Sequence, residues 1–290
     1  MARFAMGIAH YVYDVVTSSG RCLVVRIGTP ADTAHFAGAA YWSNLLRPLG
    51  VPLPTLLQAG THAGMPYIVI ERLPGTDLGL VYGELTTDEK RGIAAEVARI
   101  QSTVRRLPEG RGYGFVHHQG GPFPHRTWAG VVHASLARSR AWIDAAQLLD
   151  TDFVDRVERR AERFDRYFAT IPPRAFLDDT TTKNVIVHHG RVSGIVDVDV
   201  VCFGDPLFAL ALTRTALLND GQIPDYVDYW CDLLDLTAEQ RGVLQFYTTL
   251  FCVVLLSEFG HRFNRKRALP LDAVRLSRLT AALDAHLAET

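Results

Sequence analysis

The residues whose types and spacing suggest chemistry lie in two short stretches that follow one another closely. Asp179 precedes Asn184, and an apolar run, a His-Gly turn and a second apolar run then lead to Asp197. Short apolar runs joined by a turn are typical of paired strands. This order therefore places two carboxylates and one amide at the ends of paired strands, where they can hold a metal–triphosphate and orient a hydroxyl group beside it.

Each of these side chains has a predicted role in phosphoryl transfer. Mg²⁺ prefers hard oxygen ligands and needs few of them from the protein, so Asn184 and Asp197 are suited to bind it. Asp179 would accept or orient the proton of the acceptor hydroxyl. Taken singly, Asp179 fits a turn or a helix cap equally well, and Asn184 fits a bond to the local backbone. Their joint spacing beside two apolar runs favours the catalytic interpretation.

The elements that must position these residues divide the chain in two. The first part is predicted to be a small antiparallel β-sheet with one helix: strands at 11–16, 22–27, 55–59 and 67–71, and a helix from about Asp32 to Leu46. The turn Thr17–Gly20 joins the first two strands as a hairpin. Leu73-Pro-Gly75 breaks this pattern, so we expect a lobe at 1–73 and a second lobe at 74–290.

The second part is predicted to be mainly helical. A capping box at Thr86–Glu89 precedes an apolar repeat with helical spacing. Residues 153–168 carry one apolar stripe, and leucines from 276 to 287 form a closing amphipathic helix. Residues 110–124 are expected to form a loop, and 184–196 the only β element of this part. The fold class is therefore α+β and bilobal, with the catalytic β-hairpin in the helical lobe and ligands between the lobes.

Composition narrows the classes of function. The chain has 290 residues, of which 48% are hydrophobic, enough for a sizeable core. Its net charge of −1 gives no overall field for nucleic acid or an anionic membrane. No secretory signal follows Met1, and the apolar run at 250–256 is too short to span a bilayer. The four cysteines are scattered in apolar surroundings, which predicts buried free thiols and a cytoplasmic location.

Several motifs together resemble the aminoglycoside phosphotransferase and choline kinase-like family. The most specific are Asp179-x4-Asn184, Ile195-Val-Asp-Val-Asp199 and Gly204-Asp-Pro-Leu-Phe208. Residues 66–75 resemble the hinge of that family, and the resemblance extends over roughly the whole chain. It implies a protein-kinase-like fold, ATP or GTP as phosphoryl donor, Mg²⁺ as cofactor and a small-molecule hydroxyl as acceptor.

The resemblance also implies roles for the residues that match the motifs. Asp179 is the catalytic base, and Asn184 and Asp197 are the metal ligands. Asp199 matches a second acidic position that supports either the metal shell or the fold.

Nucleotide contacts are implied at five positions: Gly7, Arg26, Glu71, Leu73 and Lys183. Gly7 lies in the segment similar to the phosphate-covering hairpin, and the backbone from Glu71 to Leu73 matches the hinge that takes the adenine edge. Arg26 occupies the strand position where relatives carry Lys, and an arginine can grip a phosphate with two hydrogen bonds. Lys183 either touches the terminal phosphate or the acceptor, or is an exposed loop lysine.

Two departures from the family keep a second interpretation open. Relatives have His-Gly before the catalytic Asp, where this chain has Leu177-Asp178. The helix reads Phe36-Ala-Gly-Ala-Ala-Tyr41 where relatives carry the Glu that pairs with their strand Lys. The leading hypothesis is a small-molecule kinase, and the alternative is a catalytically weak or inactive nucleotide-binding protein on the same fold.

The acceptor and the oligomeric state are left open by the sequence. Five carboxylates of the helical lobe are candidates for binding a cationic acceptor: Asp220, Asp225, Asp228, Asp232 and Glu258. A basic cluster near the C-terminus, comprising Arg262, Arg265, Lys266 and Arg267, argues against a strongly cationic acceptor if it lies at the cleft.

Overall fold

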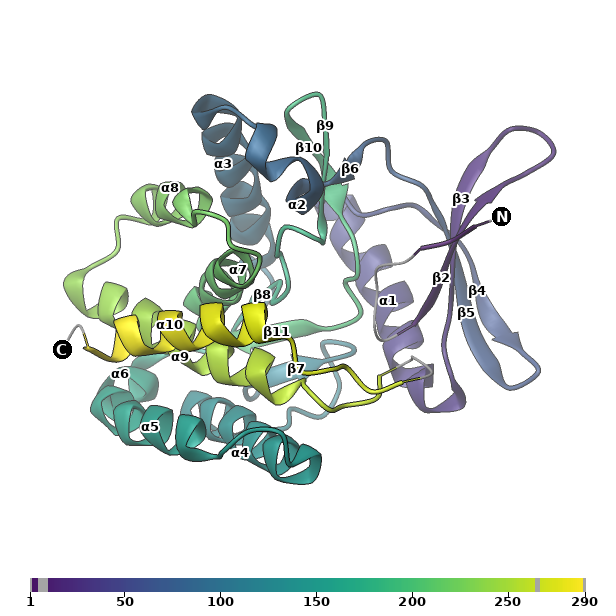
Figure 1. Cartoon of the computed structure of the whole chain (residues 1–290). Helices are drawn as coiled ribbons and strands as arrows, with labels where there is room; N and C mark the ends of the chain where they lie inside the picture. The colour runs from purple at the N-terminus through teal and green to yellow at the C-terminus, as the bar shows by residue number, and fades with distance from the viewer. Residues whose placement is uncertain (1, 5–9, 264–266, 289–290) are drawn as a thin grey trace.

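The structure is a computed structural model that describes residues 2–4, 10–263 and 267–288, and it has two lobes (Figure 1). The small lobe is a five-stranded antiparallel sheet in the order β1-β2-β3-β5-β4. Its strands are β1 (Ala2–Arg3), β2 (Tyr11–Val16), β3 (Cys22–Ile27), β4 (Leu56–His62) and β5 (Met65–Glu71). The predicted strands at 11–16 and 22–27 are confirmed, because a tight turn and apolar periodicity fix a hairpin locally.

Helix α1 (Thr33–Leu46) packs on this sheet and also reaches the other lobe (Figure 1). It follows a short 3-10 turn at Pro30–Asp32 and ends in another at Arg47–Leu49. Its Trp42 is fully buried in the core of the helical lobe and donates from Nε1 to the Val116 carbonyl at 3.0 Å. One helix therefore belongs to both lobes.

The helical lobe follows β5. Its helices are α2 (Leu78–Val81), α3 (Thr87–Val104), α4 (Trp128–Ala146), α5 (Asp152–Ala161), α6 (Asp165–Thr170), α7 (Leu207–Asn219), α8 (Asp225–Leu234), α9 (Ala238–Ser257) and α10 (Ala273–Ala288), with 3-10 turns at Tyr82–Glu84 and Glu162–Phe164. Thr86 caps α3 as predicted, accepting from the Glu89 N–H. The single stripe expected at 153–168 is divided, because the 3-10 turn at Glu162–Phe164 separates α5 from α6.

Two three-stranded sheets lie inside the helical lobe, in the orders β10-β9-β6 and β7-β11-β8. Their strands are β6 (Thr76–Asp77), β7 (Gly114–Val116), β8 (Arg174–Phe176), β9 (Val185–His188), β10 (Arg191–Ile195) and β11 (Val201–Gly204). The expectation of a single β element at 184–196 was wrong, because strands this short carry no readable periodicity and pair with distant segments. Their position matters for function, since β8 ends and β9 begins on either side of the Asp179 loop.

The Gly204-Asp-Pro motif is part of the core. A Cβ on Gly204 would lie 2.0 Å from the indole of Trp128, so only glycine fits there. Asp205 accepts hydrogen bonds from the Leu207 N–H and the Tyr247 hydroxyl, both at 3.0 Å, and Tyr247 in turn accepts from Trp128 Nε1 at 2.5 Å. Burial raises the pKa of the Asp205 carboxyl to about 6. The motif joins β11, α4 and α9.

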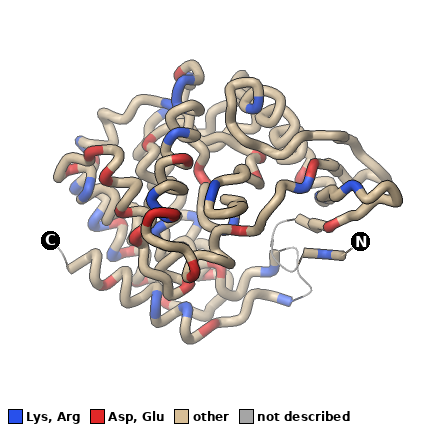
Figure 2. Tube along the Cα trace, turned by 90° about the horizontal axis from the view of Figure 1, so that it is seen from above, with Lys and Arg blue, Asp and Glu red and all other residues tan. Residues whose placement is uncertain are grey.

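The surface carries both signs of charge. Figure 2 shows positive and negative residues interspersed over the helices. Among the described residues, each helix is too short or too polar to cross a bilayer. Three of the four cysteines are buried and free, but Cys22 is exposed at the start of β3, which corrects the prediction for that residue.

Candidate active site

The loop between β8 and β9 holds Asp179 by its own side chains. Thr181 Oγ1 donates to Asp179 Oδ1 at 2.6 Å, and Lys183 Nζ lies 3.3 Å from Asp179 Oδ2. The carboxylate is partly buried, whereas the Lys183 side chain is 57% exposed. The loop therefore fixes the direction of the carboxylate and leaves one edge open to solvent.

Asn184 is buried and oriented by a bond to the same loop. Its Nδ2 donates to the Asp179 carbonyl at 3.1 Å, and its backbone N–H donates to the Thr181 carbonyl at 2.9 Å. Because the amide nitrogen is engaged, the amide oxygen faces away from this bond. That oxygen is a suitable hard ligand for a divalent cation.

Asp197 follows β10 and has a left-handed backbone with φ of 66°. Non-glycine residues adopt this conformation rarely, and such strain is often found at functional sites. Val196, its neighbour, donates from its N–H to the Asn184 carbonyl at 2.9 Å. A continuous set of bonds thus brings Asp179, Asn184 and the Asp197 segment together.

Arg26 of β3 lies buried against two carboxylates of the helical lobe. Its Nη1 and Nη2 donate to Oδ1 and Oδ2 of Asp199 at 2.7 and 2.6 Å, and Nη2 lies 2.8 Å from Oδ1 of Asp197. Nη2 also contacts Nδ1 of His10 at 2.9 Å. Burial lowers the pKa of His10, and Arg26 lowers it further, so a neutral imidazole accepts this bond.

The residues around Arg26 also include candidate metal ligands. His10, Asp197 and Asp199 have potential ligand atoms within 4.8 Å of one another. The guanidinium of Arg26 already contacts all three, and both oxygens of Asp199 bond to it. Asp197 is half exposed, so of these two carboxylates it is the more accessible to a cation.

Helix α1 lies close to the Asp199 backbone at Gly38. A Cβ on Gly38 would lie 2.2 Å from the Asp199 carbonyl oxygen, so there is no room for a side chain at that position. The carboxylate partner of Arg26, absent from α1 as the sequence indicated, comes from the helical lobe instead.

Comparison with known proteins identifies the family of this arrangement. The sequence matches the phosphotransferase enzyme family over residues 1–242. The chain belongs to this family.

Solved structures of two aminoglycoside phosphotransferases share the fold of this chain. Aminoglycoside phosphotransferase APH(4)-Ia is similar in structure, with a TM-score of 0.70 and 15% identity over 99% of this chain and 92% of that one. Aminoglycoside 2'-phosphotransferase-IIIa, solved with GDP, has a TM-score of 0.68, also with 15% identity over 99% and 92%. These likenesses establish the protein-kinase-like fold.

A curated relative is the subtelomeric hrmA-associated cluster protein of Aspergillus fumigatus. It is 30% identical over 129 residues, which is 41% of this chain. The matched segment spans 25% of the length of that relative.

The predicted nucleotide contacts of this chain differ in what surrounds them. Gly7 lies outside the described residues. In the hinge, the Glu71 N–H donates to the Thr55 carbonyl at 2.9 Å and the Arg72 N–H to the Cys22 carbonyl at 3.4 Å. Within the described chain the Leu73 N–H has no backbone acceptor, so it is the hinge donor that a ligand could use.

A residue that the sequence interpretation missed braces the catalytic loop. Gln101 of α3 is buried, donates from Nε2 to the Leu177 carbonyl at 2.7 Å, and accepts from the Leu177 N–H at 2.9 Å. It also lies 3.3 Å from the Thr180 hydroxyl. This clamp acts where relatives have the missing loop His. The sequence did contain a signal for this role, because Gln101 is a polar residue directly after the apolar Ile100 of the predicted helix.

Asp178 is a second, partly buried carboxyl in this loop. Burial raises its pKa to about 7, and the neighbouring Asp179 contributes in the same direction. Two adjacent carboxyls repel each other when both are charged, which raises the pKa of one of them. The structure assigns this shift to Asp178.

The candidate acceptor carboxylates do not lie together. Asp225 pairs with Lys90 at 3.0 Å and with the Tyr82 hydroxyl, and Asp228 pairs with Arg214. Both are on α8, on the side of the helical lobe away from the small lobe (Figure 1). Asp220 follows the end of α7, and Asp232 lies on α8. Only Glu258, at the end of α9, is close enough for its charge to interact with Asp179.

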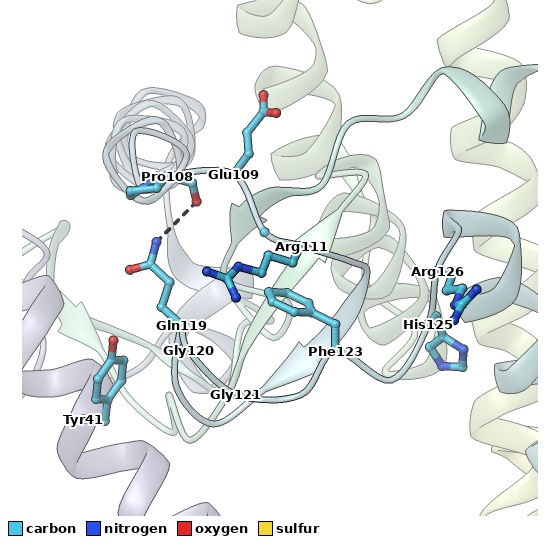
Figure 3. A pocket seen from close by; sticks show the side chains of 11 residues that line it. Tyr41, Pro108, Glu109, Arg111, Gln119, Gly120, Gly121, Phe123, His125 and Arg126 are labelled. Atoms are coloured by element: carbon cyan, nitrogen blue, oxygen red, sulfur yellow. Dashed lines mark hydrogen bonds between the residues drawn. The ribbon is translucent and has the colours of Figure 1, made fainter.

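Two cavities flank α1. The larger, of about 810 Å³, lies between Tyr41 of α1 and the loop from Pro108 to Arg126, away from the catalytic residues (Figure 3). A smaller one of about 40 Å³ is lined by Arg26 and Asp197 among other residues. The smaller volume suits little more than one water, because the Arg26 side chain fills this part of the junction.

Proposed function

We propose that this protein transfers the terminal phosphoryl group of ATP or GTP to a hydroxyl of a small molecule. The observation that carries this proposal is the orientation of Asn184, whose amide nitrogen bonds the backbone of Asp179 and whose oxygen stays available. The proposed base and a hard oxygen ligand are thereby held in one rigid unit. Positioning of this kind supplies most of the catalysis in phosphoryl transfer.

In this proposal Asp179 accepts the hydroxyl proton as the acceptor oxygen bonds to the terminal phosphorus. The bond from that phosphorus to the bridging oxygen breaks, and the nucleoside diphosphate leaves. Asn184 and Asp197 would hold Mg²⁺, which when bound supplies positive charge to the phosphates. Asp199, predicted as a third metal-site residue, is better suited to holding Arg26, since both its oxygens bond the guanidinium.

The nucleotide would lie between the lobes, here taken as residues 1–73 and 74–290. We propose that Leu73 and the Glu71 carbonyl take the adenine edge, and that Arg26, Gly7 and Lys183 serve the phosphates. The proposed setting is cytoplasmic, without nucleic-acid or membrane partners.

A catalytically weak nucleotide-binding protein is the second candidate. The observation that favours it is the pairing of Arg26 with Asp197 and of Lys183 with Asp179. If these ion pairs persist with nucleotide bound, they occupy the groups that transfer requires.

The test is phosphoryl transfer from MgATP and MgGTP to a panel of hydroxyl compounds, with nucleotide affinity measured separately. Asp179→Ala is expected to lower turnover by about 10³-fold, as for loss of a general base, while affinity for MgATP is kept. Asp197→Ala is expected to lose both turnover and affinity for MgATP. Unchanged turnover in both variants would refute the proposal, and nucleotide binding without transfer to any acceptor would favour the second candidate.

A further inference from the structure

The cavity of about 810 Å³ between α1 and the loop from Pro108 to Arg126 has no part in the proposed phosphoryl transfer (Figure 3). Its lining shares no residue with the catalytic loop or with the cluster around Arg26. Small-molecule sites are concave regions of about 300–1,000 Å³. The cavity is therefore large enough for a ligand of its own.

The loop side of this cavity is fixed by close packing within the helical lobe. The backbones of Tyr113 and His125 exchange two hydrogen bonds, at 2.9 and 3.2 Å. The Phe123 ring packs edge to face on the buried Phe203, with ring centroids 5.1 Å apart. A Cβ on Gly110 would lie 2.7 Å from the Phe123 ring, so the backbone approaches the ring directly there. This wall needs no ligand to hold it in place.

The opposite wall is Tyr41 of α1. Its ring lies across the rings of Trp42 and His118, with centroids 5.0 and 5.9 Å apart. The residue is nevertheless 37% exposed, and its hydroxyl points from α1 toward the loop (Figure 3). An aromatic face and a hydroxyl group are thus both accessible from the cavity.

The unmatched charges of the lining are positive. Arg111 and Arg126 are exposed and form no salt bridge within the part of the chain that the structure describes. Of the described residues that line the cavity, Glu109 alone is acidic, and its Oε1 lies 3.1 Å from Nε of Arg174. In Figure 3 the Glu109 carboxylate points away from the Arg111 guanidinium. The two lining arginines therefore remain available to an anion.

These features together favour an organic anion with a flat ring. A guanidinium can bond a carboxylate or phosphate with two hydrogen bonds, and the rings of Tyr41 and Phe123 suit an aromatic partner. A cationic compound would be repelled by Arg111 and Arg126.

We propose that this cavity is a second ligand site, which binds an aromatic compound bearing a carboxylate or phosphate, with the acid group on Arg111. Because its walls come from α1 and from the helical lobe, the bound anion holds these two against each other. The site does not depend on the phosphotransferase chemistry, since it shares no residue with the groups that carry that chemistry.

The test compares four naphthalene compounds that share one ring system and differ in charge. Naphthyl phosphate, naphthoate, naphthylmethanol and naphthylmethylamine are titrated calorimetrically into the full-length protein, with and without an excess of MgAMP-PNP. We expect one of the two anions to bind at least about 10-fold more tightly than the alcohol, the effect of one charge-assisted pair. The amine should bind more weakly than the alcohol. The tighter of the two anions distinguishes phosphate from carboxylate.

Substitution of Arg111 shows whether the preference comes from this cavity. Arg111→Gln is expected to weaken binding of the preferred anion by about 10-fold and to leave binding of the alcohol unchanged. Arg111→Lys should weaken it less, because it keeps the charge and loses the fork. Arg106→Gln is the matched control, because Arg106 is exposed but lies outside the lining, and it should change neither affinity.

Hydrogen exchange locates the bound anion independently of the variants. Binding should slow exchange in α1 and in residues 108–126 and leave α9 unchanged. Protection confined to other segments would contradict the proposal.

The remaining outcomes decide the proposal in the same way. Equal affinity for the anions and the alcohol overturns it, and so does an anion preference that persists in Arg111→Gln. Failure of both anions to bind overturns it as well. Displacement of the anion by MgAMP-PNP would place it in the nucleotide site and would also overturn the proposal. None of these results bears on phosphoryl transfer, which the Asp179→Ala and Asp197→Ala variants test.

Discussion

The hydrophobic cores of the two lobes differ in size. Among its described residues, the small lobe has a separate core of three buried residues, Phe36, Ala39 and Ile68. The helical lobe has a large continuous core, and it includes Trp42 and Leu46 from α1. The small sheet therefore depends on its junction with the helical lobe, whereas the helical lobe has its own hydrophobic support.

The buried carboxylates of the two regions show the same difference. Asp199 at the junction is balanced by a charged partner from the other lobe, Arg26. Asp205 inside the helical lobe is balanced by the Tyr247 hydroxyl and a backbone N–H. An ion pair between lobes can be exchanged for a ligand charge, whereas a network of neutral donors inside one core fixes a single arrangement. The acceptor side is thus expected to be preformed and the nucleotide side to be adjustable.

The largest expected effect comes from breaking the junction. Arg26→Ala leaves the buried Asp199 without its cation, which costs about 3–5 kcal/mol of unfolding free energy. We expect a lower Tm, and loss of hydrogen-exchange protection in β2 and β3 before α9. Affinity for MgATP should fall as well, since Arg26 is the proposed phosphate ligand.

A double variant separates these two effects. Arg26→Met with Asp199→Leu removes both charges and should recover most of the stability without recovering nucleotide affinity. Equal loss of protection in β3 and α9 in Arg26→Ala would contradict the difference between the lobes.

The next largest effect is expected inside the helical lobe. Gly204→Ala places a methyl group 2.0 Å from the Trp128 ring, and overpacking of this kind costs about 3 kcal/mol. Thermal unfolding measures the loss, and the folded fraction should still bind MgATP with unchanged affinity. If Gly204→Ala were stable but bound MgATP more weakly, the helical core would affect nucleotide binding rather than stability. That result would contradict the difference between core and junction.

Much of the fold was predictable because its signals are local. The hairpin of β2 and β3, the capping box of α3 and the spacing of Asp179 and Asn184 lie within short windows of sequence. Other features depend on contacts between distant segments. The partner of Arg26 is 173 residues away, and the pairing of β7 and β8 on β11 involves strands of three residues. Local periodicity carries no information about such contacts.

The missed clamp on the catalytic loop gives a smaller and more specific prediction. Gln101→Ala leaves the buried N–H and carbonyl of Leu177 without partners, at a cost of about 2 kcal/mol. Because the displaced loop carries Asp179, we expect kcat to fall about 10-fold with little change in the KM for nucleotide. Gln119→Ala removes a glutamine with a single 3.4 Å bond to the Pro108 carbonyl and serves as the control. Equal changes in kcat for both variants would show that Gln101 has no special role in positioning.

The smallest expected effect depends on pH and compares two carboxyls of one lobe, the partly buried Asp178 and the buried Asp205. The pKa of Asp178 is raised by burial, and by Asp179, from 3.8 to about 7. A raised pKa means that the folded protein favours the protonated carboxyl, so the stability it contributes is present below the unfolded pKa and lost as pH rises through about 7. Asp178→Asn should therefore be more stable than the unmodified protein at pH 8, by about 1–2 kcal/mol, and lose this advantage near pH 4.

Asp205 gives the contrasting case. Its pKa is also raised by burial, to about 6, but its oxygens accept from Leu207 and Tyr247. Asp205→Asn adds two N–H donors to a site that is already filled with donors, so we expect destabilisation at both pH values. Urea unfolding of the two variants at pH 4 and pH 8 measures the difference. Among the described residues, the Asp178 carboxylate has its own backbone N–H as a donor but no side-chain donor. A gain in stability at pH 8 for Asp178→Asn alone would therefore show that the charge of Asp178, rather than burial as such, weakens the loop.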